Sequence, residues 1–146
     1  MLIYDTLQKR KVELVPAPGG RGAKPAKGHF GIYLCGPTVY DYGHLGHGRS
    51  AIVFDVLRRY LAYKGYAVTF VRNWTDIDDK TIDRANREGV TVRELTEKFI
   101  KIYEEDFRAL NILEPDFAPK PTEHIPEIIA VIERLFERGH AYTLPD

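Results

Sequence analysis

Two short apolar runs flank one amphipathic stretch in the first half of the chain. The first run, His29 to Cys35, is rich in β-prone residues and ends at Gly36-Pro37, which does not extend a strand comfortably. Apolar residues then recur at helical spacing from Ala51 to Leu61, ahead of Gly65, a natural helix terminator. Ala67 to Val71 is the second strand-length run, and the helix supplies the crossover that parallel strands require. The pattern predicts a right-handed βαβ unit and an α/β fold with a parallel sheet.

The flanking segments predict further helices and one loop. Residues 1–15 have room for short strands, and the Pro/Gly-rich residues 16–28 predict a flexible solvated loop, with contact to nucleic-acid or other phosphate as the alternative. Helices are predicted over 81–87, from the Thr91 to Glu94 capping box onward, and from a cap at Thr122 or His124 to Gly139. Residues 140–144 predict a strand without a visible partner, so we expect the chain to stop inside a larger domain.

Composition excludes several classes of protein without naming an activity. The 146 residues carry 21 basic and 21 acidic side chains, so no polyanion-binding tail is indicated. The single cysteine excludes an internal disulfide and a self-contained Cys₄ or Cys₂His₂ zinc site. No segment has the pattern of a membrane span or a cleavable signal, so we expect a soluble, cytoplasmic protein with no membrane partner.

The loop between the first predicted strand and its helix carries two histidines, His44 and His47. They are one helical turn apart, so both imidazoles can lie on one face at the helix start, where free backbone N–H groups favour phosphate. Gly46 between them leaves backbone against which a flat base can lie. A histidine pair at this spacing is also common on protein surfaces and at helix caps, and a metal pair would need a third ligand.

Other polar residues at the two strand ends have a structural and a functional interpretation. Cys35 is either a buried, inert thiol or a ligand, and Thr75 is either a helix N-cap or a substrate contact. Asp76, Asp78 and Asp79 suggest a Mg²⁺ site, but we favour helix capping and the helix dipole as their role. Trp74 is expected to fill the core.

Several longer strings carry a resemblance to a known family. They are Cys35-Gly-x-Thr-Val-Tyr-Asp41 before His44-Leu-Gly-His-Gly-Arg49, Val71-Arg-Asn-Trp-Thr-Asp-Ile-Asp-Asp-Lys80, and Gly139-His-Ala-Tyr142. Together they closely resemble the cysteinyl-tRNA synthetases, which are class I aminoacyl-tRNA synthetases. The resemblance implies a Rossmann-type catalytic domain with crossover helices, of which residues 1–146 are the N-terminal half. It implies ATP-dependent activation of L-cysteine, with Mg²⁺ accompanying ATP, and ligation of the cysteine to tRNA(Cys).

The resemblance also implies an ATP site around the start of the predicted helix. His44 and His47 are the catalytic pair and stabilise the triphosphate as pyrophosphate leaves, while Gly46 lies under adenine. Arg49 assists in binding phosphate, although an ion pair on the helix surface is the simpler role for it. Because both reacting groups belong to the substrates, such an enzyme works by positioning and charge stabilisation.

For the cysteine site, the resemblance implies roles for Cys35, Gly36 and Thr75. Cys35 is one of four protein ligands of a zinc ion that also binds the substrate thiolate, Gly36 approaches the substrate with its backbone, and Thr75 contacts it. Soft sulfur prefers Zn²⁺ to a hydroxyl oxygen, which discriminates cysteine from serine. The remaining zinc ligands lie outside this chain, which has no second cysteine.

Two parts of the family's machinery are missing from the 146 residues: the lysine-rich second signature loop and an anticodon-binding bundle. We therefore expect the isolated chain to be inactive. Two alternatives remain open, a ligase of the same fold that joins cysteine to an amino sugar, and a non-catalytic module that binds a nucleotide or a partner.

Overall fold

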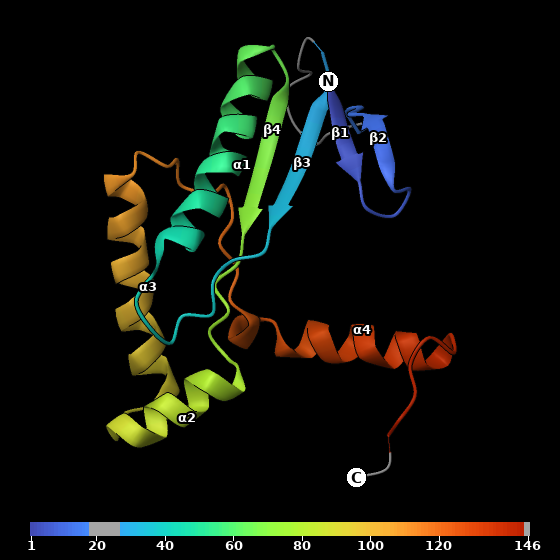
Figure 1. Ribbon diagram of the computed structural model, residues 1–146. Coiled ribbons are helices and arrows are strands. Elements are labelled where there is room, and N and C mark those ends of the chain that lie inside the picture. The colour runs from blue at the N-terminus through green and yellow to red at the C-terminus, as the bar shows by residue number, and fades with distance from the viewer. Residues whose placement is uncertain (18–26, 145–146) are drawn as a thin grey trace.

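The computed structural model describes residues 1–17 and 27–144, and Figure 1 shows their arrangement. The predicted flexible loop falls mostly on residues 18–26, outside the described part of the chain. The elements in chain order are β1 (Leu2–Asp5), β2 (Arg10–Glu13), β3 (His29–Leu34), α1 (Leu45–Tyr63), β4 (Ala67–Arg72), α2 (Asp79–Glu88), α3 (Val92–Ala109), a short 3₁₀ turn η1 (Pro121–Glu123) and α4 (Ile125–Glu137).

The β3–α1–β4 unit confirms the prediction of a parallel pair joined by a crossover helix. β3 and β4 are parallel in the register His29 to Ala67 through Leu34 to Arg72, and α1 packs against β4. Gly65 ends the turn after α1 with φ at +87°, a left-handed conformation that favours glycine. Residues 116–119 run along the other edge of β4, where Arg72 N donates to Phe117 O at 3.1 Å and Trp74 N donates to Pro119 O at 3.0 Å. The carboxyl end of β4 is therefore held on both sides.

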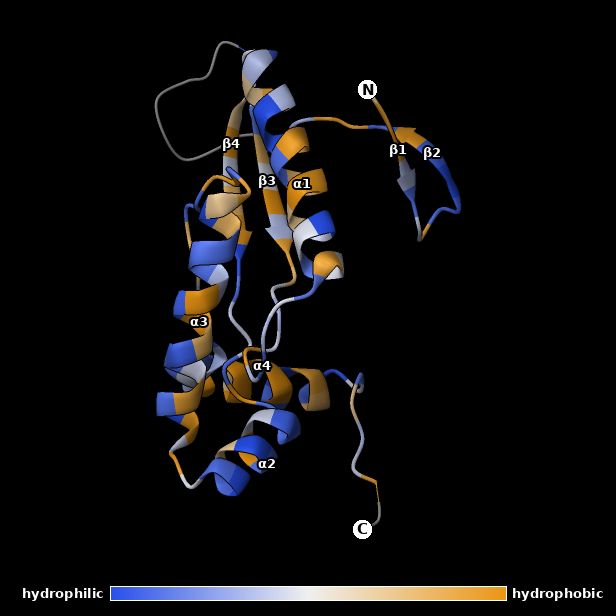
Figure 2. Cartoon of the chain, turned by 60° about the vertical axis from the view of Figure 1, so that its left-hand side comes forward, coloured by the Kyte–Doolittle hydropathy of each residue, from blue (hydrophilic) through white to orange (hydrophobic). Residues whose placement is uncertain are grey.

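The first fifteen residues form the short strands that the sequence allowed. β1 and β2 pair as a separate antiparallel hairpin, from Leu2 opposite Glu13 to Asp5 opposite Arg10. The hairpin stands apart from the parallel pair, as the turned view in Figure 2 shows. It connects to β3 through Ala17, whose N–H donates to His29 O at 2.9 Å.

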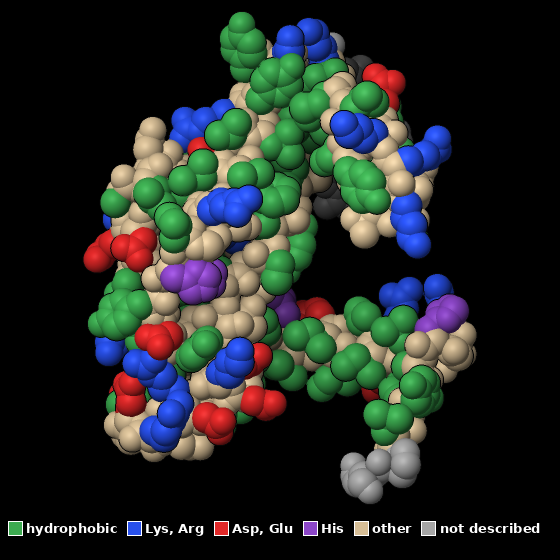
Figure 3. Space-filling model, viewed as in Figure 1, with side chains coloured by type: hydrophobic (Ala, Val, Ile, Leu, Met, Phe, Trp, Pro, Cys, Tyr) green, Lys and Arg blue, Asp and Glu red, His purple; other side chains and the backbone are tan. Residues whose placement is uncertain are grey.

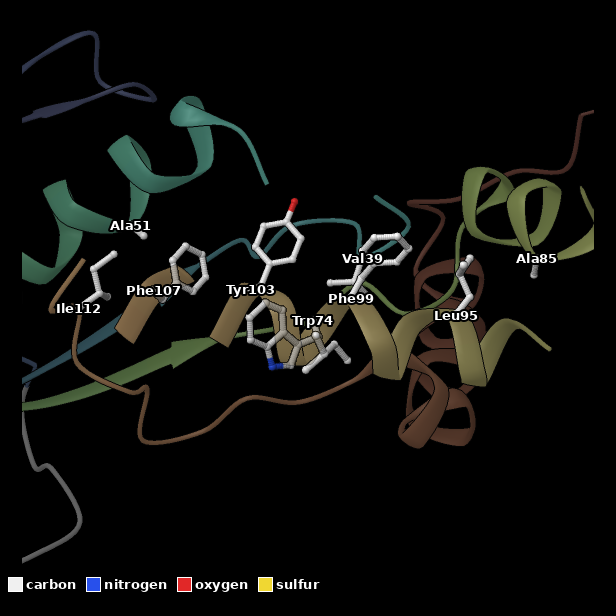
Figure 4. Close-up of a cluster of buried hydrophobic side chains, with 10 residues drawn as sticks. Val39, Ala51, Trp74, Ala85, Leu95, Phe99, Tyr103, Phe107 and Ile112 are labelled. Atoms are coloured by element: carbon white, nitrogen blue, oxygen red, sulfur yellow. The ribbon is translucent and has the colours of Figure 1, made fainter. Parts of the chain in front are cut away.

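The largest buried cluster lies beneath the loops at the carboxyl ends of β3 and β4, and Figure 4 shows its side chains. α3 supplies half of it, and Trp74 is 3% exposed, which confirms its core role. The cluster consists of Val39, Ala51, Trp74, Ala85, Leu95, Phe99, Ile100, Tyr103, Phe107 and Ile112. On α3, Leu95, Phe99 and Phe107 are buried, whereas Leu110, the residue after the helix, is 48% exposed.

The C-terminal part corrects one prediction. Residues 140–144 form no strand, because His140 N donates to Leu135 O at 2.9 Å and closes α4, and no described strand lies alongside them. α4 extends away from the body, with an apolar surface visible in Figures 2 and 3. Its large apolar side chains, from Ile125 to Phe136, are between 40% and 54% exposed. No helix in the described part of the chain is long and apolar enough to cross a membrane.

Candidate functional site

A pocket of about 300 Å³ opens where the carboxyl end of β3 meets the first turn of α1. In open α/β sheets this edge is where ligands bind. The structure brings four of the predicted site residues into this pocket: Cys35, Gly36, Gly46 and His47. The rest of its lining is Leu34, Pro37, Thr38, Ser50, Ala51, Arg72 and Phe107.

His44 and His47 adopt a reciprocal capping arrangement at the start of α1. His44 is the N-cap, and its Nδ1 accepts a hydrogen bond from Gly46 N at 3.1 Å, while His47 Nδ1 accepts one from His44 N at 3.2 Å. A backbone N–H can only donate, so each Nδ1 is unprotonated and each neutral ring carries its proton on Nε2. The two rings stack with centroids 3.9 Å apart. The local fold thus prepares two Nε2–H donors at a helix N-terminus.

The two histidines differ in the hollows that they line. His47 is half-buried and lines the pocket with Cys35, whereas His44 is exposed and lines an adjacent hollow of about 300 Å³ that His47 also borders. Tyr103 lies behind His47, with its hydroxyl 3.4 Å from His47 Nδ1 and the ring planes nearly perpendicular. Burial and the neighbouring His44 lower the pKa of His47 below its ordinary value. His47 is therefore a neutral donor at neutral pH.

Gly36 is the point of closest approach between the two strand ends. A Cβ on Gly36 would lie 1.6 Å from Asn73 O, so only glycine fits. Gly36 N donates to Asn73 Oδ1 at 2.7 Å, and Asn73 Nδ2 donates to Thr75 Oγ1 at 3.1 Å. Asn73 therefore links Gly36, in the pocket wall, to Thr75, which is half-buried and does not itself line the pocket.

Thr75 is not a helix N-cap, so that interpretation was wrong. It bridges to Thr38, and its N–H donates to Pro37 O at 3.1 Å. The cap of α2 is Asp78, whose carboxylate accepts from Lys80 N at 2.9 Å, and Asp79 occupies the first turn of α2, as the capping interpretation predicts. Asp76 has another role, because it is buried and accepts hydrogen bonds from Thr122 N and Thr122 Oγ1.

Cys35 is exposed, which contradicts the interpretation as a buried, inert thiol. Its thiol contacts only the adjoining Gly36 carbonyl, at 3.7 Å, among the hydrogen bonds of the described residues. No group of three or more potential metal ligands occurs within residues 1–17 and 27–144. A thiolate at Cys35 suits Zn²⁺ as one ligand, and the described residues do not supply the others.

Gly46 and Arg49 complete the predicted set. A Cβ on Gly46 would lie 2.8 Å from His44 Cε1, so the glycine leaves room for the His44 ring. Arg49 is exposed on α1, does not line the pocket, and forms no ion pair with a described residue. The alternative of a helix-surface ion pair is therefore wrong within the described chain.

Three residues of the site were not identified from the sequence as functional. Asn73 and Arg72 follow each other at the end of β4, and Tyr103 lies on the buried face of α3. The only signal for the first two was their position, since polar residues that end a parallel strand lie at the ligand-binding edge. Tyr103 had no signal beyond helical spacing.

Comparison with known proteins places this geometry in a family. Residues 23–146 match the family model described as the tRNA synthetases class I (C) catalytic domain. The chain is 52% identical over 145 residues to a cysteine–tRNA ligase of Maridesulfovibrio salexigens, covering 99% of this chain and 28% of the relative. It is 49% identical to that of Archaeoglobus fulgidus and 51% identical to that of Campylobacter lari, covering 29% and 30% of those relatives. The chain thus spans less than a third of the length of these curated relatives.

A solved structure supports the same fold. Mycobacterium tuberculosis methionyl-tRNA synthetase in complex with methionyl-adenylate superposes with a TM-score of 0.55 at 23% identity, over 63% of this chain and 18% of that one. This likeness confirms the predicted α/β fold of the class I catalytic domain. The cysteine–tRNA ligases that the chain matches over nearly its whole length point to the same family. The chain therefore belongs to the tRNA synthetases class I (C) catalytic domain family.

Proposed function

We propose that residues 1–146 are the N-terminal half of the catalytic domain of a cysteine–tRNA ligase. The full enzyme activates L-cysteine with ATP and transfers it to tRNA(Cys) in the cytoplasm. Family membership supports this assignment. The observation that carries it is a single pocket containing both Cys35 and His47, a thiol and a prepared Nε2–H donor at a helix N-terminus.

The proposed chemistry needs no nucleophile from the protein. The cysteine carboxylate attacks the α-phosphorus of ATP, and pyrophosphate leaves with the negative charge. His47, His44 and the positive end of the α1 helix dipole stabilise that charge, Gly46 lies under adenine, and Arg49 assists the phosphates. A neutral histidine is an effective donor here because its Nδ1 is already occupied by a backbone amide and its ring is held by stacking.

For the amino acid, we propose that Cys35, Gly36 and Thr75 form the binding site. Cys35 would hold zinc as one thiolate ligand, the other ligands coming from the remainder of the enzyme. When bound, zinc supplies a soft Lewis acid that prefers the substrate thiolate to a hydroxyl group. Gly36 presents backbone that Asn73 fixes, and Thr75 is tied to the same asparagine. Mg²⁺ accompanies ATP as substrate.

The test is cysteine-dependent exchange of labelled pyrophosphate into ATP by the full-length enzyme, followed by charging of tRNA(Cys). Cys35→Ala should abolish the cysteine-dependent exchange. Gly31→Ala is a matched control on β3, since a Cβ at Gly31 meets nothing within 4 Å. Exchange that persists in Cys35→Ala contradicts the proposed site. Transfer to an amino sugar instead of tRNA contradicts the proposed acceptor.

A further inference from the structure

Arg72, the last residue of β4, is a buried cation next to the pocket. Only 4% of its surface is exposed, although arginine is rarely buried without a partner. Its guanidinium lies over the Phe107 ring at 4.2 Å and near the Trp74 ring at 5.1 Å. Aromatic rings cover the faces of a guanidinium and leave its N–H edges to be satisfied by acceptors.

Those edges are not satisfied by the described protein. Arg72 Nε is buried and has no hydrogen-bond partner among the described residues. The guanidinium also forms no ion pair with them. Asp55 and Glu104 attract it, but Asp55 already accepts hydrogen bonds from Arg59 Nε at 2.7 Å and Leu113 N at 3.1 Å. Burial lowers the pKa of Arg72, yet an arginine remains protonated, so the charge stays.

Arg72 lies in the wall between two hollows of different charge. The hollow of about 400 Å³ on one side also has Glu104, Glu114 and a second arginine, Arg108, in its lining, so the charges around it balance. The pocket of about 300 Å³ has no acidic residue in its lining, and Arg72 is its one permanently charged side chain. On that side Arg72 shares the pocket with His47 and the first turn of α1, which also favour negative charge.

We propose that Arg72 binds an oxyanion of the substrate in the pocket that contains Cys35 and His47. The group is a carboxylate or a phosphate, and this inference rests on the function proposed above. The aromatic rings hold the guanidinium plane in a fixed orientation, and the ligand meets the part of Arg72 that lines the pocket. Arg72 is then retained despite the cost of burying an unpaired charge, because the ligand pairs with it.

The decisive variant is Arg72→Met in the full-length enzyme. Methionine has no charge, so the substitution removes the cost of keeping an unpaired charge out of water. We therefore expect an unchanged or higher melting temperature. Affinity for the anion should fall by about 10- to 100-fold, the loss typical of a hydrogen bond to a charged group. A merely structural arginine would give the opposite pattern, a lower melting temperature with unchanged affinity.

Three probes titrated calorimetrically distinguish the source of the anion: L-cysteine, cysteamine, which lacks the carboxylate, and inorganic phosphate. Weaker binding of L-cysteine but not cysteamine identifies the carboxylate, and weaker binding of phosphate identifies a phosphate group. Equal binding of all three probes by Arg72→Met and wild type overturns the proposal, and so does a wild type that binds neither cysteine nor phosphate.

Two further variants complete the design. Arg58→Met removes another arginine that lies over an aromatic ring, Phe70, but is paired with Asp116. It should lower stability and leave binding of the probes unchanged. Arg72→Lys keeps the charge and should restore part of the affinity. Wild type could bind phosphate in an Arg72-dependent manner and yet show no cysteine-dependent pyrophosphate exchange. That result contradicts the proposed function but not the role of Arg72.

Discussion

Replacing Gly36 by alanine tests how the two strand ends meet. The added Cβ would lie 1.6 Å from Asn73 O and 2.7 Å from Asn73 C, both backbone atoms, where ordinary contact starts at 3.4 Å. The ends of β3 and β4 must therefore separate by about 2 Å, since a packed interior has no free space to absorb the methyl group. That movement disrupts the hydrogen bond from Gly36 N to Asn73 Oδ1 and the two backbone bonds that join Thr75 to Pro37 and Val39.

The cost follows from these contacts. Each lost hydrogen bond costs about 1 kcal/mol, and overpacking adds about 1–3 kcal/mol. The free energy of unfolding should fall by about 4–6 kcal/mol, a large part of the 5–15 kcal/mol that roughly spans natural domains. Urea denaturation followed by fluorescence reports this change, because Trp74 is the one tryptophan and is buried next to the strand end.

Gly31→Ala is the control from the same strand, because its Cβ meets nothing within 4 Å. We expect its midpoint to equal or exceed that of wild type, since alanine loses less entropy than glycine, a gain of about 0.5 kcal/mol. Should Gly36→Ala be insoluble while Gly31→Ala folds, the difference already supports the argument. A Gly36→Ala midpoint equal to that of wild type would refute it.

Four further outcomes are expected. His47→Ala in the full-length enzyme should slow cysteine-dependent pyrophosphate exchange by on the order of 10²-fold while ATP affinity changes less, and a wild-type rate would count against the donor role. The pKa of His47 is lower in the folded protein than in the unfolded chain, so as pH drops the unfolded chain takes up the proton at a higher pH. The free energy of unfolding should therefore fall as pH drops from the ordinary histidine pKa towards the folded value. His47→Gln should remove that part of the pH dependence, and a profile identical to that of wild type would contradict the assignment. The 146-residue chain should lose zinc on dialysis, because Cys35 supplies one of four ligands, and stoichiometric retention by metal analysis would contradict this. The same chain should not charge tRNA with labelled cysteine, and turnover within about tenfold of the full-length enzyme would show that its active site is complete.

The parallel unit could be predicted because hydrophobic burial alone determines it. Residues 29–71 hold two β-prone runs on either side of a helical apolar pattern, and β3, α1 and β4 follow them closely. The same reasoning failed at residues 140–144, where an alternating run is necessary for a strand but a hydrogen-bonding neighbour is also required.

The sequence predicted where His44 and His47 lie, but not the hydrogen bonds that connect the residues around the pocket. The spacing of His44 and His47 places both rings on one side of a helix start, but the proton positions depend on the extended conformation of His44, which no periodicity specifies. Asn73 joins Gly36 to Thr75 across the sheet, a contact between residues 37 positions apart in sequence. One amide in a polar string gives no sign of such a role. Arg72 escaped notice because an arginine at a strand end is expected to be solvated.

At the start of α1, the same hydrogen bonds that cap the helix also orient the two histidine rings as Nε2–H donors. The atoms that begin the helix, His44 Nδ1 and His47 Nδ1, also set where each ring keeps its proton. Aspartate or serine at position 44 would cap the helix better, and aspartate would also suit its dipole. Either change would remove the Nε2–H donor, and aspartate would add a negative charge at the proposed phosphate site. Under the function proposed above, stronger capping at position 44 therefore removes a donor, and stabilising substitutions belong elsewhere in the fold.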